Sequence, residues 1–282
     1  MKISEIIKKK RTFSFEFFPP KEESQNESFA KNLKDLIPLK PDFVSVTDTG
    51  YSAAKYKHLA LSMLLKEKAG FDVILHLTCL NSTKREIGTV LEKAKAAGIE
   101  NILALRGDPD PNREILPGDF SYASDLIKEI DLSGFCAGAA AHPEKHPLSA
   151  SLKEDMSILK MKADLGVSFF ITQLFFDNSV FFRLRDDLAK NNISVPIIAG
   201  IMPLASPLSL LKIEEKTGKI SKPKALIEIM EKYSNDKESF FKASVEFSIN
   251  QCEELLSKGT NALHFFTFNK AKAVKEILGA IK

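Results

Sequence analysis

The sequence predicts an α/β protein: a closed barrel of eight strands that alternate with helices, with extra helices before the last strand. Three observations lead to this fold class. Short apolar segments rich in β-branched and aromatic residues recur eight times along the 282 residues. Most of their starts lie roughly 30 residues apart, which is the length of one strand with its crossover helix. Segments with helical periodicity lie between them, and the interval before the last strand is the longest.

The eight strands are expected to begin near Phe13, Phe43, Val73, Ile102, Phe135, Ser168, Val195 and Ala262. Helical periodicity predicts helices over residues 52–68, 84–97 and 150–164, and three extra helices over 207–217, 223–233 and 238–257. No linker or shift of composition interrupts the chain, so residues 1–282 are interpreted as one catalytic domain with a (β/α)8 TIM-barrel fold. An open doubly wound sheet is the alternative, but no glycine fingerprint follows the first strand.

Composition narrows the class of protein. The chain is 44% hydrophobic and 27% charged, with a net charge of only +3, so charge gives no reason to expect a nucleic-acid partner. The basic cluster at residues 8–11 is interpreted as a solvated helix end. Cys79, Cys136 and Cys252 have neither disulfide-framework nor metal-ligand spacing. No signal-peptide core and no apolar run of membrane length are found, so a cytoplasmic protein is expected.

Functional sites of such barrels form at the carboxyl ends of the strands. In the first strand, alternation places Glu16 on the face opposite Phe15 and Phe17. A partly desolvated carboxyl group beside Phe18 has a raised pKa, which suits a general acid, whereas the alternative is a structural ion pair. In the third strand, His76 is either a ligand-binding residue or a core histidine with its hydrogen bonds satisfied.

The fourth strand ends in Arg106-Gly107-Asp108, which offers a ligand both charges and a close backbone approach; the alternative is an Arg–Asp turn pair. Two histidines, His142 and His146, follow the fifth strand, but the prolines beside them exclude a regular helix and disfavour a zinc site.

The next predicted helix places Asp155 and Lys162 on one face, where they either hold ribose and phosphate or are merely solvated. Gln173 is a polar residue in the apolar sixth strand, so its side chain must be hydrogen-bonded.

Together these motifs resemble those of the methylenetetrahydrofolate reductase family, specifically its short bacterial type. The matching stretches, in the family's order, are FEFFPP at 15–20, VSVT at 44–47, HLTC at 76–79, LRGD at 105–108, YASDL at 122–126, PEKHP at 143–147, ITQ at 171–173, GIMP at 200–203 and HFFT at 264–267. They span nearly the whole chain. The resemblance implies no C-terminal regulatory domain of the animal and fungal type.

The resemblance implies an enzyme of one-carbon metabolism and methionine biosynthesis that reduces 5,10-methylenetetrahydrofolate to 5-methyltetrahydrofolate. It implies non-covalent FAD, which NADH or NADPH reduces before the folate enters the same face, in a ping-pong order. It also implies a homo-oligomer and no metal. By match, the catalytic residues would be Glu16, the acid that helps to open the folate's imidazolidine ring, and Asp108, whose charge stabilises the resulting cation.

The same matches imply FAD contacts by Thr47, Asp48, His76, Arg106, Gly107, Asp108, Tyr122, Ala123, His142, His146, Asp155 and Lys162. They imply substrate contacts by Glu16, Gln173, Ser209, Ile213, Phe268 and Lys270.

Several positions depart from the family's pattern. The strand-two threonine is followed by DTGY at 48–51 in place of an aromatic residue and a Gly-Ala-Gly-like run. His142 replaces a tyrosine, Ser209 a glutamine, Ile213 a phenylalanine and Lys270 an arginine. The flavin site is therefore expected to be intact and the surface for donor and folate altered. Two alternatives stay open: a non-catalytic folate- or flavin-binding barrel subunit, and a reductase supplied by a redox partner protein.

Overall fold

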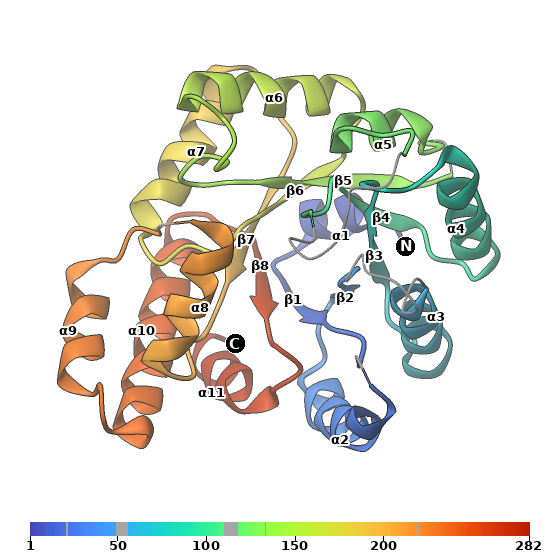
Figure 1. Ribbon diagram of the computed structural model, residues 1–282. Helices are drawn as coiled ribbons and strands as arrows, with labels where there is room; N and C mark the ends of the chain where they lie inside the picture. Colours follow the sequence, from blue (N-terminus) through green and yellow to red (C-terminus); the bar gives the residue numbers. More distant parts are fainter. Residues whose placement is uncertain (21, 49–55, 110–117, 133, 219) are drawn as a thin grey trace.

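The computed structural model describes residues 1–20, 22–48, 56–109, 118–132, 134–218 and 220–282. Its eight parallel strands pair in chain order, and the eighth pairs with the first, so that the sheet closes into a barrel. Helices alternate with the strands and surround them (Figure 1). The predicted (β/α)8 fold is confirmed. In the described part of the chain, no helix has the length and apolar character needed to cross a membrane.

The strands begin within two residues of the positions predicted from the sequence. They are β1 (Thr12–Phe17), β2 (Phe43–Val46), β3 (Val73–Thr78), β4 (Asn101–Leu105), β5 (Cys136–Ala141), β6 (Phe169–Thr172), β7 (Ile197–Ile201) and β8 (Ala262–Phe266). The largest difference is at β7, which begins after Pro196. Proline has no N–H group to donate to the neighbouring strand, which explains the later start.

The helices that surround the barrel are α2 (Asn26–Leu36), α3 (Lys57–Ala69), α4 (Lys84–Ala96), α5 (Ala123–Glu129), α6 (Leu152–Asp164), α7 (Asn178–Lys190) and α11 (Ala271–Ile281), with short 3-10 turns η1 (Glu23–Gln25) and η2 (Ile37–Leu39). Local signals set their starts: Thr83 and Glu86 form a capping box before α4, and the Ser151 side chain caps α6. Of the helix predicted over 52–68, α3 accounts for the part from Lys57, and 52–55 lie outside the described residues.

The predicted extra helices are present between β7 and β8. They are α8 (Pro207–Thr217), α9 (Lys224–Lys232) and α10 (Lys237–Ser257). Figure 1 shows them gathered on one side of the barrel, opposite α3 and α4. Leu210 of α8, Leu226 of α9 and Phe240 of α10 pack against buried residues that follow β6 and β7, including Leu174 and Met202. This packing fixes the three helices at the carboxyl ends of those strands.

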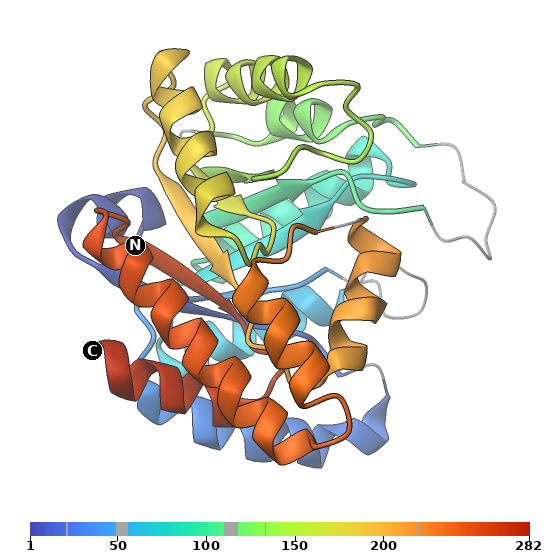
Figure 2. The same cartoon turned by 90° about the vertical axis from the view of Figure 1, so that its left-hand side faces the viewer.

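The N-terminal end of the barrel is closed by α1 (Ile3–Lys9). Its buried isoleucines belong to one cluster with inward-facing strand residues such as Phe43 and Phe169. Gly138 of β5 makes room for this filling, because a Cβ atom there would lie 2.2 Å from the Phe169 ring. In Figure 2, α1 and both termini lie on the side of the barrel away from α8. The core therefore fills the amino end of the barrel and leaves the carboxyl end for polar side chains.

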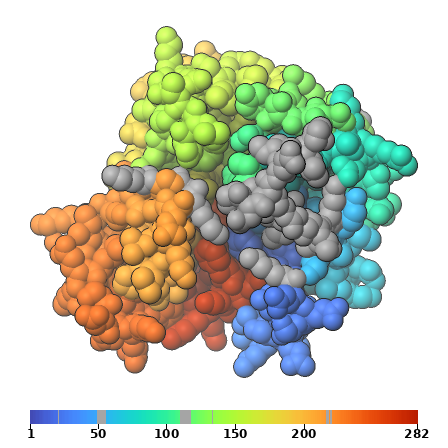
Figure 3. Space-filling view, viewed as in Figure 1, coloured from blue at the N-terminus to red at the C-terminus, as the bar shows by residue number. Residues whose placement is uncertain are grey.

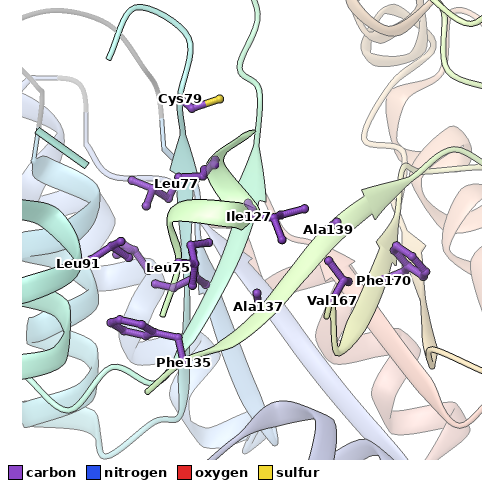
Figure 4. Close-up of a cluster of buried hydrophobic side chains, with 14 of the residues drawn as sticks. Leu75, Leu77, Cys79, Leu91, Ile127, Phe135, Ala137, Ala139, Val167 and Phe170 are labelled. Atoms are coloured by element: carbon purple, nitrogen blue, oxygen red, sulfur yellow. The ribbon is translucent and has the colours of Figure 1, made fainter. Parts of the chain in front are cut away.

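The outer faces of the strands pack against the helices in two large clusters. One lies between β3–β6 and helices α4 to α7, and includes Leu75, Leu77, Phe135 and Phe170 (Figure 4). The other joins β1, β2, β7 and β8 to α2, α10 and α11, and contains Phe15 and Phe17. These two phenylalanines face outward, which leaves Glu16 on the inner face as the alternation predicted.

Candidate active site

The Glu16 carboxyl group lies inside the barrel near the end of β1. Only 6% of the residue is exposed, and its Oε2 lies 3.9 Å from Nε2 of His76 on β3. Burial raises the pKa of Glu16 to about 8, and the neighbouring Thr47 hydroxyl partly opposes this rise. At pH 7 the side chain is therefore mostly protonated and able to donate a proton. This agrees with the general-acid interpretation rather than with an ion pair.

His76 is neutral at this position. Burial, then the nearby His264, lowers its pKa to about 3. An acid with a pKa of about 8 does not transfer its proton to so weak a base, so the proton stays on Glu16. One buried side-chain atom here, Nε2 of His76, has no hydrogen-bond partner in the described structure. The His76 side chain is therefore buried with one ring nitrogen that makes no hydrogen bond.

His264 of β8 forms a polar layer inside the barrel. The residue is fully buried, its Nδ1 lies 2.8 Å from the Ser14 hydroxyl, and its Nε2 lies 3.1 Å from the Ser45 hydroxyl. Burial lowers its pKa to about 3, so the ring is neutral. One ring nitrogen therefore donates a hydrogen bond and the other accepts one. Sequence reasoning quoted His264 in a motif but gave it no role; its place as a polar residue in an apolar strand was the available signal.

Asp48 joins the end of β2 to β3 and α3. Its Oδ2 accepts hydrogen bonds from the Thr78 amide at 3.0 Å and the Thr78 hydroxyl at 2.7 Å. Its Oδ1 lies 3.5 Å from Nδ1 of the buried His58. Asp48 was predicted to contact FAD, and the structure places both of its oxygens in contacts within the protein. The other members of that departing motif, residues 49–51, lie outside the described residues.

Arg106, Gly107 and Asp108 follow β4, as predicted. Arg106 donates from Nε to the Ser121 carbonyl at 3.1 Å, which holds the strand end against the start of α5. Gly107 has φ +84°, and a Cβ atom there would lie 3.1 Å from Cβ of Thr78. Asp108 is exposed, so its charge lies at the surface of this end of the barrel.

The start of α5 carries Tyr122 and Ala123, both predicted FAD contacts. Tyr122 is 65% exposed and precedes the helix, where its amide donates to Oδ2 of Asp125 at 3.0 Å. Ala123 is the first residue of α5. Both residues therefore lie beside Arg106, next to the carboxyl end of β4.

A second charged cluster follows β5. The His142 and His146 rings pack edge to face, 4.5 Å apart between centroids. Asp155 of α6 accepts hydrogen bonds from the His146 amide at 3.3 Å and the Ser149 hydroxyl at 2.9 Å. Lys162 lies on the same face of α6 as Asp155, as predicted, and donates to the Ala140 carbonyl at 3.3 Å.

The cluster is partly withdrawn from water, which shifts its protonation. Burial, with help from His146 and Lys162, lowers the pKa of His142 to about 3. Burial also lowers the pKa values of His146 and Lys162, and Asp155 partly offsets both shifts. The charges of Arg106 and Asp108 also act on His146, so the two charged clusters are close to each other.

A cavity of about 450 Å³ borders this cluster between α6 and α7. His142 and Asp155 line it together with Lys153, Lys160 and Arg183. The cavity adjoins the histidine cluster rather than Glu16. It lies between two outer helices and is therefore not the place where Glu16 would act.

The predicted substrate contacts lie on several elements. Gln173 was expected within the sixth strand but lies just after β6, which ends at Thr172. Its side chain is hydrogen-bonded within the protein, as expected, because Oε1 accepts from the Leu174 amide at 2.9 Å. On α8, the Ser209 hydroxyl lies 2.9 Å from that of Ser206, and Ile213 packs against the cluster that fixes the extra helices. Figure 3 shows the carboxyl-end face, with α8 and α9 on one side and α5 and α6 on the other.

Phe268 and Lys270 follow β8. Phe268 is 49% exposed and stacks on Phe18 after β1, with 5.5 Å between ring centroids and 5° between planes. Lys270 is exposed at the start of α11. The stacked pair, with Phe268 exposed and Phe18 partly buried, presents an apolar ring surface after β1 and β8.

This arrangement defines the class of protein: an α/β barrel whose polar and titratable side chains gather at the carboxyl ends of its strands. The sequence model described as methylenetetrahydrofolate reductase matches residues 2–282, and the chain belongs to that family. Methylenetetrahydrofolate reductase 1 of Schizosaccharomyces pombe is 32% identical over 99% of this chain and 48% of its own length. The chain thus spans about half of that relative. The 5,10-methylenetetrahydrofolate reductase of Escherichia coli is 32% identical over 92% of this chain and 86% of its own.

A solved structure has the same fold. It is described as an uncharacterized protein from Clostridium thermocellum that binds two copies of 5-methyl-5,6,7,8-tetrahydrofolic acid. The TM-score is 0.66 at 17% identity, over 99% of this chain and 97% of the other. At that identity the likeness concerns the fold alone.

Proposed function

We propose that this protein is an FAD-dependent reductase of 5,10-methylenetetrahydrofolate that uses NADH or NADPH as donor. One equivalent of donor and one proton convert the folate to 5-methyltetrahydrofolate. The observation that carries the proposal is the buried, protonated Glu16 beside a neutral His76, in a chain of the methylenetetrahydrofolate reductase family. Barrel enzymes place their chemistry at this end of the strands.

Glu16 supplies the proton. Opening the imidazolidine ring requires protonation of the ring nitrogen that leaves the methylene carbon, and a carboxyl group with a pKa of about 8 is mostly protonated near neutral pH. His76, 3.9 Å away, is too weak a base to take that proton. The negative charge of Asp108 would favour the cation that ring opening creates.

The residues present fit a dinucleotide flavin. Nε2 of His76 is buried and lacks a hydrogen-bond partner in the described part of the chain. Each unsatisfied buried group costs roughly 1–3 kcal/mol, which a hydrogen-bonding ligand would recover. Arg106 and Lys162 provide positive charge suited to a pyrophosphate, and Asp155 provides an acceptor suited to a ribose. When bound, FAD would supply the hydride transfer.

Helix α8 carries two residues at which this chain differs from the family's usual pattern. Ser209 and Ile213 stand where a glutamine and a phenylalanine are expected, so donor recognition is weaker or is achieved by other contacts. A reductase supplied by a redox partner protein is the second candidate that this difference favours.

Purification and extraction of the bound ligand test the proposal. The protein should be yellow, and the extracted flavin should co-elute with FAD rather than FMN. Recovery of FMN alone, or failure to bind added FAD, contradicts the proposal. An assay with NADH, NADPH and methylenetetrahydrofolate then separates the candidates: turnover supports the reductase, flavin without donor oxidation supports a partner-supplied enzyme, and ligand binding without any turnover supports a binding subunit.

A further inference from the structure

Glu144 lies in the loop between β5 and α6 and accepts three hydrogen bonds from a single residue of another segment. The Ser221 amide lies 2.8 Å from Oε1 and 3.0 Å from Oε2, and the Ser221 hydroxyl lies 2.8 Å from Oε2. Hydrogen bonds to a carboxylate are stronger than those between neutral groups. One side chain therefore joins the loop after β5 to the connection between α8 and α9.

The connection that carries Ser221 is held firmly against α8. Nζ of Lys222 lies 2.7 Å from both carboxylate oxygens of Glu214, and Oε1 of Glu214 also accepts from the Ile220 amide at 3.2 Å. Ile220 is buried in the cluster that packs the extra helices. Because Glu214 directly follows Ile213 on α8, a restraint on Ser221 is transmitted to the part of that helix that carries Ile213.

The loop on the other side is anchored without Glu144. His146 and Ser149 both donate to Asp155 of α6. Lys145 has φ 111°, a left-handed conformation that costs a non-glycine residue roughly 1–3 kcal/mol and persists only when surrounding contacts hold it. Its Nζ donates to the carbonyls of His146, at 3.2 Å, and of Ser149. The loop is thus a fixed point to which α8 can be tethered.

We propose that Glu144 is a positioning residue that tethers α8 across the carboxyl end of the barrel and thereby sets affinity for NAD(P)H and folate rather than for FAD. This rests on the proposed function. The groups suited to FAD stay in place without the tether because Asp155 holds their loop. Ser209 and Ile213 lie on α8, so loosening the tether changes the surface that the second ligand meets.

The test compares wild-type protein with Glu144→Ala, Glu144→Gln and Ser221→Ala. In Glu144→Ala, amide hydrogen exchange in α8 and α9 should rise about tenfold, because the local opening energy falls. KM for NAD(P)H and folate should rise about three- to tenfold, with kcat and the FAD dissociation constant within about twofold. Glu144→Gln keeps an acceptor oxygen and Ser221→Ala keeps the backbone donor, so both should give smaller changes of the same kind.

Glu129→Ala is the matched control, because it removes a glutamate of α5 that pairs with Lys84 away from α8. It should leave exchange in α8 and the KM values unchanged. Unchanged exchange in α8 and α9 of Glu144→Ala would overturn the tether. A fall in FAD affinity in step with the rise in KM would overturn the selective role. If the wild-type protein does not turn over, the proposed function fails, while the exchange measurement still decides whether the tether exists.

Discussion

Replacing Glu16 with glutamine should separate the two half-reactions. The amide keeps the size of the side chain but cannot deliver a proton. With a pKa of about 8, roughly nine-tenths of the Glu16 side chains are protonated at pH 7. Most wild-type molecules therefore hold the proton that the reaction requires. Loss of a general acid usually costs about 10²- to 10⁴-fold. We expect folate reduction to slow by that factor and flavin reduction by NAD(P)H to stay within about tenfold.

Stopped-flow absorbance resolves the two steps in one instrument. Flavin bleaching on mixing with NADH reports the first, and the return of absorbance on mixing reduced protein with methylenetetrahydrofolate reports the second. Glu253→Gln, an exposed change on α10, is the control and should alter neither rate. An equal loss in both half-reactions of Glu16→Gln would mean that Glu16 is structural, and the acid mechanism would be refuted.

The pKa of Glu16 also predicts two pH profiles. The folate half-reaction needs the protonated carboxyl, so its rate should be level below about pH 8 and fall above it. The raised pKa means that the folded state binds this proton more tightly than the unfolded state. Stability is therefore lost as pH rises from about 4.5 to about 8, by up to about 5 kcal/mol. Glu16→Gln should lack that loss, so denaturant unfolding at pH 9 should show a more stable variant.

Three further changes test other parts of the site. Ile213→Phe should tighten NAD(P)H binding by about 2- to 13-fold, which corresponds to the free energy of one aromatic pairing, with little change in FAD affinity. Flavin-reduction rates measured against donor concentration give the dissociation constant. Gly107→Ala should destabilise the protein by about 1–3 kcal/mol in urea unfolding, because of its positive φ and the 3.1 Å approach to Thr78. Thermal unfolding should show stability falling as pH drops from 6.5 towards 3, because His76 and His264 are buried neutral while unfolded histidines gain protons.

Local patterns predicted most of the fold. Strand starts, the extra helices and the inward direction of Glu16 all follow from periodicity over a few residues, and the structure agrees with each. The shared face of Asp155 and Lys162 follows from helical geometry in the same way. These features depend on neighbours in sequence, which is why the sequence alone reveals them.

Contacts that depend on closure of the barrel were not predictable. The FAD contact predicted for Asp48 stays a prediction, and its hydrogen bonds to Thr78 of β3, 30 residues away, were not foreseen. Ser14 and His264 meet across 250 residues because β1 pairs with β8. Propensity and motif spacing carry no information on such pairs. The pairing of strands decides them, and it is known only once the order and register of the barrel are fixed.

A single-turnover experiment tests the central claim most directly. Protein reduced with one equivalent of NADH, without oxygen, is mixed with methylenetetrahydrofolate, and the products are separated by chromatography. We expect one equivalent of 5-methyltetrahydrofolate per bound flavin, formed as the oxidised absorbance of FAD returns. Two results would contradict the assignment of this barrel as a methylenetetrahydrofolate reductase. In one, the flavin stays reduced in the presence of the folate; in the other, the flavin is reoxidised but no 5-methyltetrahydrofolate forms.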